Sequence, residues 1–133
     1  MIVADTNLVA YLLIEGTRTA AAKAVWEKDS QWILPTIWRS EFLNVLTTAV
    51  RADVLTVEQA HDTWHVALTI FGGSEVEPEG DDVLDQAAEY SLSAYDAQFV
   101  VAAADLNVPL VTSDRRLLAA CADLAVSPEG FVE

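Results

Sequence analysis

Short apolar runs alternate with longer segments of helical periodicity along this chain. The runs predicted to be strands cover residues 2–4, 32–34, 110–112 and 124–126. Predicted helices cover residues 6–14, 17–29, 36–51, 56–71, 94–105 and 113–122, and one more begins at Asp81 or Asp82. This alternation is typical of a parallel sheet covered by helices, so the pattern predicts an α/β fold.

Nothing in the sequence divides the chain into parts. Thr56 and Gln59 form a capping-box pattern at the start of one helix, and Gly72-Gly73-Ser74 is the clearest interruption. No internal repeat, linker or low-complexity tract is present. With 133 residues, of which 53% are hydrophobic, the chain has enough apolar surface for one core. We predict a single domain over residues 1–133.

Cysteine usage and hydropathy favour a cytoplasmic protein. Cys121 is the only cysteine, so no internal disulfide can form. The N-terminal segment lacks the positive start and long apolar middle of a signal peptide, and no uncharged apolar run approaches about 18 residues. We therefore expect no association with a membrane.

The charge balance is strongly acidic. The chain has 21 acidic and 7 basic residues, a net charge of −14, and such a field should repel bulk nucleic acid. Much of the excess lies between Glu75 and Glu89. This stretch is either a solvated acidic face or a docking surface for a basic partner.

Four carboxylates lie where a surface charge is not expected. Asp5 and Asp114 follow apolar runs, at the strand ends where open α/β sheets form their ligand crevice. Glu41 and Asp96 fall on the apolar faces of predicted helices. If the fold brings these groups together, each pair at about 4 Å repels by about 4 kcal/mol at an effective dielectric near 20. Such a cluster of hard oxygen ligands favours Mg²⁺ or Mn²⁺ and metal-dependent phosphoryl transfer.

Each of these residues also has a simpler interpretation. Asp5 and Asp114 are both placed to cap the helix that follows them. Glu41 is also compatible with a helix edge from which its carboxylate reaches water, and Asp96 with a hydrogen bond to the preceding helix end. The coincidence of all four is what favours a shared site.

Four segments of the chain resemble the PIN-domain ribonucleases, and within them the VapC-type toxins of toxin-antitoxin pairs. They occur in the order and spacing of that family, so the match extends over nearly the whole chain. The segments are Ile2-Val3-Ala4-Asp5-Thr6-Asn7, Ser40-Glu41-Phe42-Leu43-Asn44-Val45-Leu46, Ser93-Ala94-Tyr95-Asp96-Ala97-Gln98-Phe99 and Leu110-Val111-Thr112-Ser113-Asp114-Arg115-Arg116-Leu117.

The resemblance implies a three-layer α/β/α sandwich with a parallel sheet of four or five strands and an acidic pocket that holds Mg²⁺ or Mn²⁺. Metal-activated water would attack the phosphodiester and leave a 5'-phosphate and a 3'-hydroxyl. The residues that match the family's acidic quartet are Asp5, Glu41, Asp96 and Asp114, and those that match its polar neighbours are Thr6 or Asn7, and Ser113.

The same resemblance implies the substrate and partners. The substrate would be single-stranded or looped RNA, because a compact domain with few basic residues cannot grip a long duplex. Arg115 and Arg116 are the best-placed cations, although both are equally compatible with solvated helix charges, and Arg39 and Arg18 are weaker candidates. We expect a homodimer and an antitoxin whose basic C-terminal segment covers the pocket. The residues suggested for its groove are Leu8, Tyr11, Leu12 and Val25, which core packing explains equally well.

Three other classes of function compete with this one. His61 and His65 have the spacing of zinc-binding peptidases, but Asp62 stands where such enzymes carry Glu. The second alternative is a PIN-like module that binds RNA or protein without cutting. The third is a phosphatase with Asp5 as nucleophile, and Asn7 stands where that chemistry generally needs a second acid.

Overall fold

The computed structural model describes all 133 residues and contains one five-stranded sheet in which every pair of neighbouring strands is parallel. The strand order is β3-β2-β1-β4-β5. In register, Val3 lies opposite both Ile33 of β2 and Leu110 of β4. The strands are β1 (Ile2–Ala4), β2 (Trp32–Pro35), β3 (Glu75–Val76), β4 (Leu110–Val111) and β5 (Ala125–Val126).

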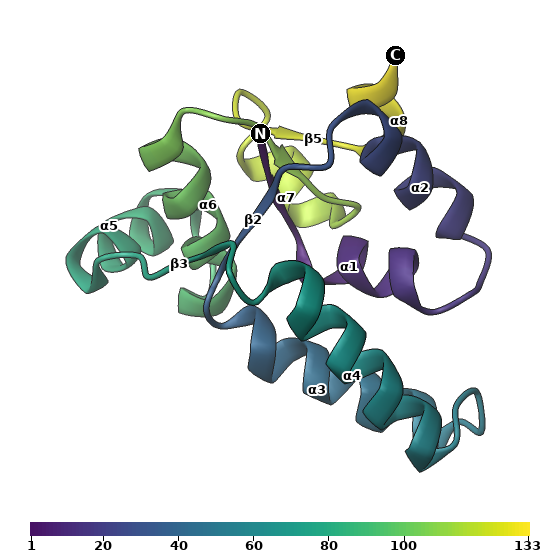
Figure 1. The fold of residues 1–133 in the computed structure, drawn as a ribbon. Coiled ribbons are helices and arrows are strands. Elements are labelled where there is room, and N and C mark those ends of the chain that lie inside the picture. Colours follow the sequence, from purple (N-terminus) through teal and green to yellow (C-terminus); the bar gives the residue numbers. More distant parts are fainter.

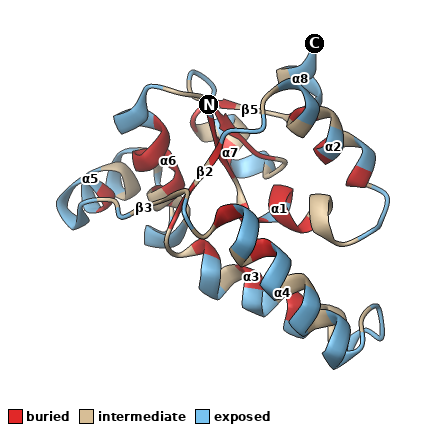
Figure 2. Cartoon of the chain, viewed as in Figure 1, coloured by how far each residue is buried: buried red, intermediate tan, exposed pale blue.

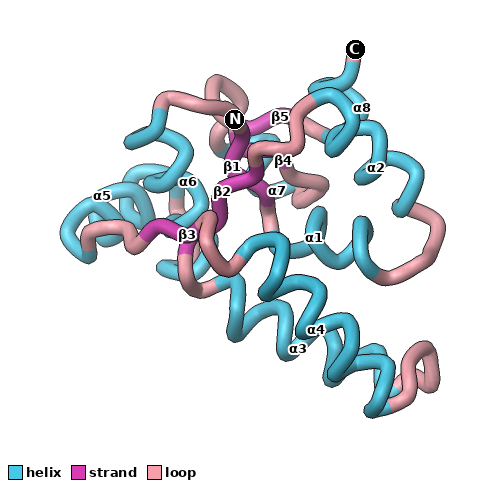
Figure 3. Tube along the Cα trace, in the orientation of Figure 1, coloured by secondary structure: helices cyan, strands magenta, loops and turns pink.

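Helices cover both faces of this sheet (Figures 1 and 3). One layer contains α1 (Thr6–Leu13), α2 (Thr19–Lys28), α3 (Trp38–Arg51), α4 (Val57–Phe71) and α8 (Pro128–Val132). The other contains α5 (Gly80–Tyr90), α6 (Ala94–Leu106) and α7 (Arg115–Ala120). The predicted three-layer α/β/α sandwich is therefore confirmed, with five strands.

Side chains that alternate between the two faces of the sheet along each strand contribute to two main hydrophobic cores. Ile2 and Ala4 of β1 pack with the layer of α1 to α4, whereas Val3 between them packs with α6 and α7. Because successive strand residues point to opposite faces, one short apolar run supplies both sides. Figure 2 shows the buried residues concentrated along the strands and on the inward faces of the helices.

The helix-capping residues predicted from the sequence lie at the ends of helices in the structure. Thr56 and Gln59 form the full capping box at the start of α4, and α4 ends at Phe71, directly before the glycine pair. Ser93 caps α6 by accepting a hydrogen bond from the amide of Asp96 at 3.1 Å.

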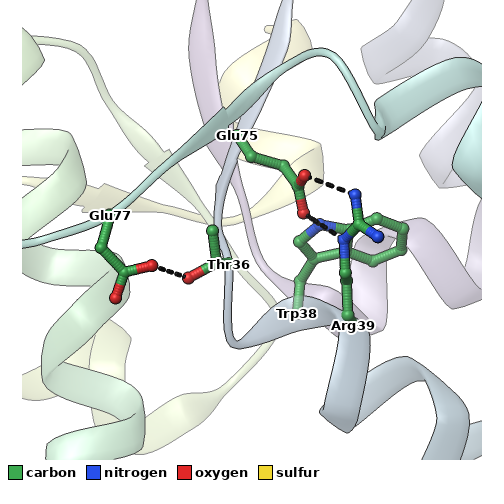
Figure 4. Close-up of polar contacts among 5 residues, drawn as sticks. All are labelled: Thr36, Trp38, Arg39, Glu75 and Glu77. Carbon is green, nitrogen blue, oxygen red and sulfur yellow. Dashed lines mark hydrogen bonds and ion pairs between the residues drawn. The ribbon is translucent and has the colours of Figure 1, made fainter.

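Two elements were not predicted: β3 and α8. Glu75, one end of the acidic stretch, fixes β3 to α3, because its carboxylate accepts hydrogen bonds at 2.7 Å from the indole of Trp38 and from Nε and Nη2 of Arg39 (Figure 4). The Thr36 hydroxyl likewise donates to Glu77. Part of the acidic stretch is thus structural.

Two residues suggested for a docking groove prove to be core residues. Leu8 and Val25 are buried, with exposed fractions of 1% and 0%, so neither is available to a partner. Their periodicity reflects packing of α1 and α2 against the sheet. Tyr11 and Leu12 are half-buried. No helix of the chain is both long and apolar enough to cross a bilayer.

Candidate functional site

The carboxyl ends of β1 and β4 bring Asp5 and Asp114 to the same edge of the sheet. The two strands are neighbours, and each acid lies just beyond its strand. Thr112 connects them: its hydroxyl donates to Asp5 Oδ2 at 2.6 Å and accepts from the backbone amide of Asp114 at 3.0 Å. Since the Thr112 side chain is fully buried, this link is shielded from water.

The other two acids come from helices in opposite layers. Glu41 lies in the first turn of α3, where the buried Thr6 donates a hydrogen bond to its Oε1 at 2.7 Å. Asp96 lies in the first turn of α6, whose start is fixed by the Ser93 cap. Both acids are half-buried.

Burial and neighbouring acids raise the pKa values of Asp5, Glu41 and Asp96. Burial is the largest cause that raises the pKa of Asp5, and the charges of Asp114 and Asp96 raise it further. Burial also raises the pKa of Glu41, with added repulsion from Asp5 and Asp96. The pKa of Asp96 is raised by burial and by Asp114. We call this set, Asp5, Glu41, Asp96 and Asp114, the acidic pocket.

The ligand types in the acidic pocket fit Mg²⁺ or Mn²⁺ better than zinc. No group of three or more His, Cys, Asp or Glu side chains is close enough in this structure to hold an ion by itself. Mg²⁺ commonly keeps several waters and takes one or two carboxylates together with substrate phosphate, so it does not need such a cage. Zinc sites need three or four protein ligands.

The two histidines do not form a peptidase site. His61 and His65 are exposed on α4 with ring centroids 6.4 Å apart, and no third ligand accompanies them. They line an open groove of 630 Å³ between α3 and α4 with mostly apolar side chains. The structure therefore does not support the zinc-peptidase alternative.

Arginines lie on more than one side of the acidic pocket. Arg116 lowers the pKa of Asp96, opposing the effects of burial and Asp114, so its charge reaches the pocket. Arg18 donates to the hydroxyl of Ser113 at 3.2 Å. Arg39 pairs with Glu75, and Arg115 is exposed without a hydrogen-bonding partner for its side chain. Asn7 is exposed as well.

The capping interpretation holds for only one of the two aspartates. Asp114 Oδ1 accepts from the amides of Arg116 and Leu117, at 2.8 and 3.1 Å, and so caps α7. Asp5 makes no side-chain cap for α1, and its carboxylate takes the Thr112 hydroxyl instead. Sequence reasoning missed the role of Thr112; the only local signal was a hydroxyl directly after an apolar run.

The fold and the acidic edge define an α/β protein with a candidate ligand site at the carboxyl ends of its strands. Residues 2–123 match the family model described as the PIN domain. The chain belongs to this family, whose members are nucleases, and the resemblance in the four sequence segments is thereby confirmed. No curated protein sequence matches the chain.

Solved structures share the fold over nearly the full chain. The crystal structure of PAE2754 from Pyrobaculum aerophilum is similar with a TM-score of 0.77 and 23% identity, covering 98% of this chain and 92% of that one. A toxin-antitoxin complex from Klebsiella pneumoniae has a TM-score of 0.67 and 22% identity, covering 96% and 98%. The crystal structure of FitAcB from Neisseria gonorrhoeae has a TM-score of 0.71 and 16% identity, and the match covers 97% of this chain and 99% of that one.

Proposed function

We propose that the chain is a metal-dependent endoribonuclease and the toxin of a toxin-antitoxin pair, acting as one PIN domain. The acidic pocket carries this proposal, because burial and neighbouring acids disfavour the charged forms of Asp5, Glu41 and Asp96, and a bound cation would offset that cost. Membership of a nuclease family supports the reaction class. Similarity to a toxin-antitoxin complex supports the toxin role.

In this proposal Asp5, Asp96, Asp114 and Glu41 are the carboxylates of a site for Mg²⁺ or Mn²⁺, in which one or two of them would bind the ion directly and waters would complete its coordination. When bound, the ion would supply a Lewis acid for the phosphodiester and a more acidic water, which leads to a 5'-phosphate and a 3'-hydroxyl. The protein's own contribution is orientation. Thr112 donates to Asp5 Oδ2 and Thr6 donates to Glu41 Oε1, and these hydrogen bonds orient the two carboxylates.

An antitoxin would inhibit by covering the acidic pocket with a basic C-terminal segment. A groove of 380 Å³ runs between the α1–α2 loop and the end of α3, lined mostly by apolar atoms and by Tyr11 and Arg18. We propose that an apolar part of the antitoxin binds there and that the toxin acts as a homodimer. A peptide carrying the basic segment should block cleavage, and the peptide with its Arg and Lys changed to Glu should not.

The decisive experiment is cleavage of a mixed small-RNA pool by the wild type and Asp96→Asn, with Mg²⁺, with Mn²⁺ and with chelator. We expect metal-dependent cuts that leave 5'-phosphates and are lost in the variant. Asp85→Asn, on the exposed side of α5, is the matched control and should cut like the wild type. Equal cutting by the wild type and Asp96→Asn would contradict the proposal, and RNA binding without cutting would favour a non-catalytic PIN-like module.

A further inference from the structure

Arg18 reaches the rim of the acidic pocket from a distant part of the chain. It is the residue before α2, and its Nη2 donates at 3.2 Å to Ser113, 95 residues away and adjacent to Asp114. Its guanidinium carbon lies 5.8 Å from the ring centroid of Tyr11, and its Nη1 pairs with Glu129 of α8. These three contacts restrict the position of the guanidinium.

This guanidinium remains open to a ligand. The side chain of Arg18 is 36% exposed and that of Glu129 is 56% exposed. A guanidinium has five donors, of which the contacts with Ser113 and Glu129 use two. A fixed, partly exposed Arg matches the geometry of a phosphate and loses little conformational freedom when it binds one.

Arg18 and Arg116 approach the end of β4 from opposite layers. Arg18 precedes α2, whose buried residues pack in the core of α1 to α4. Arg116 belongs to α7, whose Leu117 packs in the other core, and its charge acts on Asp96. A chain of phosphates crossing the sheet edge between the layers would meet one arginine on each side of the acidic pocket.

We propose that Arg18 is a phosphate-binding residue for single-stranded RNA, holding a backbone phosphate next to the scissile one while the Tyr11 ring offers a surface for the adjoining base. This rests on the proposed function, and it makes Arg18, rather than Arg115, the partner of Arg116. Base stacking on aromatic rings and cationic contacts along the backbone are the usual means of holding single strands.

Glu129 distinguishes phosphate binding by Arg18 from a purely structural role, because the two roles predict different directions of change in RNA binding when Glu129 is replaced. Its carboxylate occupies donors that a phosphate would use, so the two anions compete for Arg18. Glu129→Gln should then improve RNA binding, whereas Arg18→Ala should weaken it. If the pair served only to attach α8, both substitutions would break the same attachment and shift activity in the same direction.

The test measures kcat and KM for cleavage of a single-stranded RNA by the wild type, Arg18→Ala, Arg18→Lys, Glu129→Gln and Lys23→Ala. Loss of one charge-assisted hydrogen bond predicts a KM about tenfold higher for Arg18→Ala with kcat nearly unchanged. We expect an intermediate KM for Arg18→Lys and a KM about two- to threefold lower for Glu129→Gln. Lys23→Ala, an exposed change on the same helix, should match the wild type.

The outcomes separate this inference from the proposed function. Metal-dependent cleavage by the wild type with an unchanged KM for Arg18→Ala, or with shifts of the same sign for Arg18→Ala and Glu129→Gln, would overturn the inference alone. If the wild type cuts no RNA, the proposed function fails, and fluorescence anisotropy with the same RNA decides the subsite. Binding in the order Glu129→Gln, wild type, Arg18→Ala supports it; any other order, or no binding, overturns it.

Discussion

At the scale of single residues, Thr112 determines how Asp5 and the start of α7 are held. It is fully buried and connects the carboxylate of Asp5 with the amide of Asp114. Thr112→Val keeps the shape of the side chain but leaves both groups without that partner. We expect a loss of about 1–3 kcal/mol in the free energy of unfolding, measured by urea denaturation.

Thr112→Ser is the matched control, because it retains the hydroxyl and removes one methyl group. Its free energy of unfolding should fall by about 1 kcal/mol, which is less than the fall for Thr112→Val. The opposite order of stability would show that the methyl contacts matter more than the hydrogen bonds.

Asp96 offers a test of the repulsion in the acidic pocket. Burial and the charge of Asp114 disfavour its carboxylate more than Arg116 and the Ser93 side chain favour it, and its backbone amide serves the helix cap. Asp96→Asn should therefore raise the melting temperature in metal-free buffer by about 2–4 °C. Excess Mg²⁺ should stabilise the wild type more than the variant in differential scanning calorimetry. A lower melting temperature for the variant without metal would contradict this account.

The residues of the candidate site differ in how far local sequence could predict them. Asp5 and Asp114 follow apolar runs, and Asp96 stands out on an apolar helix face, so short patterns predict them. Thr112 and Arg18 contact residues 107 and 95 positions away, and only the tertiary fold sets those contacts. Burial and neighbouring acids raise the pKa values of Asp5, Glu41 and Asp96, whereas the convergence of all four acids on one ion and their roles in catalysis stay predictions.

At the scale of elements, the turn after α4 depends on one glycine more than on its neighbour. A Cβ atom at Gly72 would lie 2.5 Å from the carbonyl oxygen of Leu68, closer than real contacts allow, whereas one at Gly73 would meet nothing within 4 Å. Gly72→Ala should therefore cost about 1–3 kcal/mol in the free energy of unfolding, because backbone must shift. Gly73→Ala should be neutral or slightly stabilising. Thermal or urea denaturation of both variants checks this, and equal stability would refute it.

The attachment of β3 to α3 should depend on pH through Glu75. Hydrogen bonds and charge from Arg39, with a further hydrogen bond from Trp38, lower the pKa of Glu75 (Figure 4). A carboxyl group with a lowered pKa stabilises the fold above its unfolded-state pKa of about 4.3 and loses this contribution as the pH falls through the folded-state value. Glu75→Gln should thus be about 1 kcal/mol less stable at pH 7 and match the wild type at the acid end.

Measurement of the free energy of unfolding from pH 7 toward acid would show this narrowing gap. Glu79→Gln is the control, since Glu79 is exposed and its carboxylate makes no ion pair or hydrogen bond. A gap between Glu75→Gln and the wild type that stays constant with pH would show that packing, not charge, holds β3.

The elements that periodicity predicted are the ones that bury a clear face. β3 has only two residues, both half-buried, and its place in the sheet depends on contacts with α3, so no alternation could reveal it. Whereas β3 has too few buried residues for a pattern, α6 has buried residues on more than one side. Phe99 and Val100 pack toward the sheet and Val101 toward α5, which makes the helix apolar on two sides. The apolar face on which the sequence places Asp96 is therefore only one of two apolar sides of this helix.

At the scale of the whole molecule, the net charge of −14 limits how this chain can bind RNA. In the proposed function most of the surface would repel a polyanion, and the attraction would be confined to a bound cation at the acidic pocket and to the nearby arginines. This agrees with a substrate bound at two phosphates rather than along an extended basic groove.

The salt dependence of RNA binding should report this small number of contacts. For single strands, the logarithm of affinity falls by about 0.7 per phosphate contact for each tenfold rise in salt, so Arg18 and Arg116 together predict a slope of about −1.4. The slope is measured from the protein concentration that gives half-maximal single-turnover cleavage, between low and moderate NaCl in constant excess Mg²⁺. Arg18→Ala should reduce its magnitude by about 0.7, while Lys23→Ala should leave it unchanged. A slope several times steeper would require a basic surface elsewhere on the molecule, and with only seven Lys and Arg residues, two of them held in ion pairs, that surface would have to come from a second protein chain.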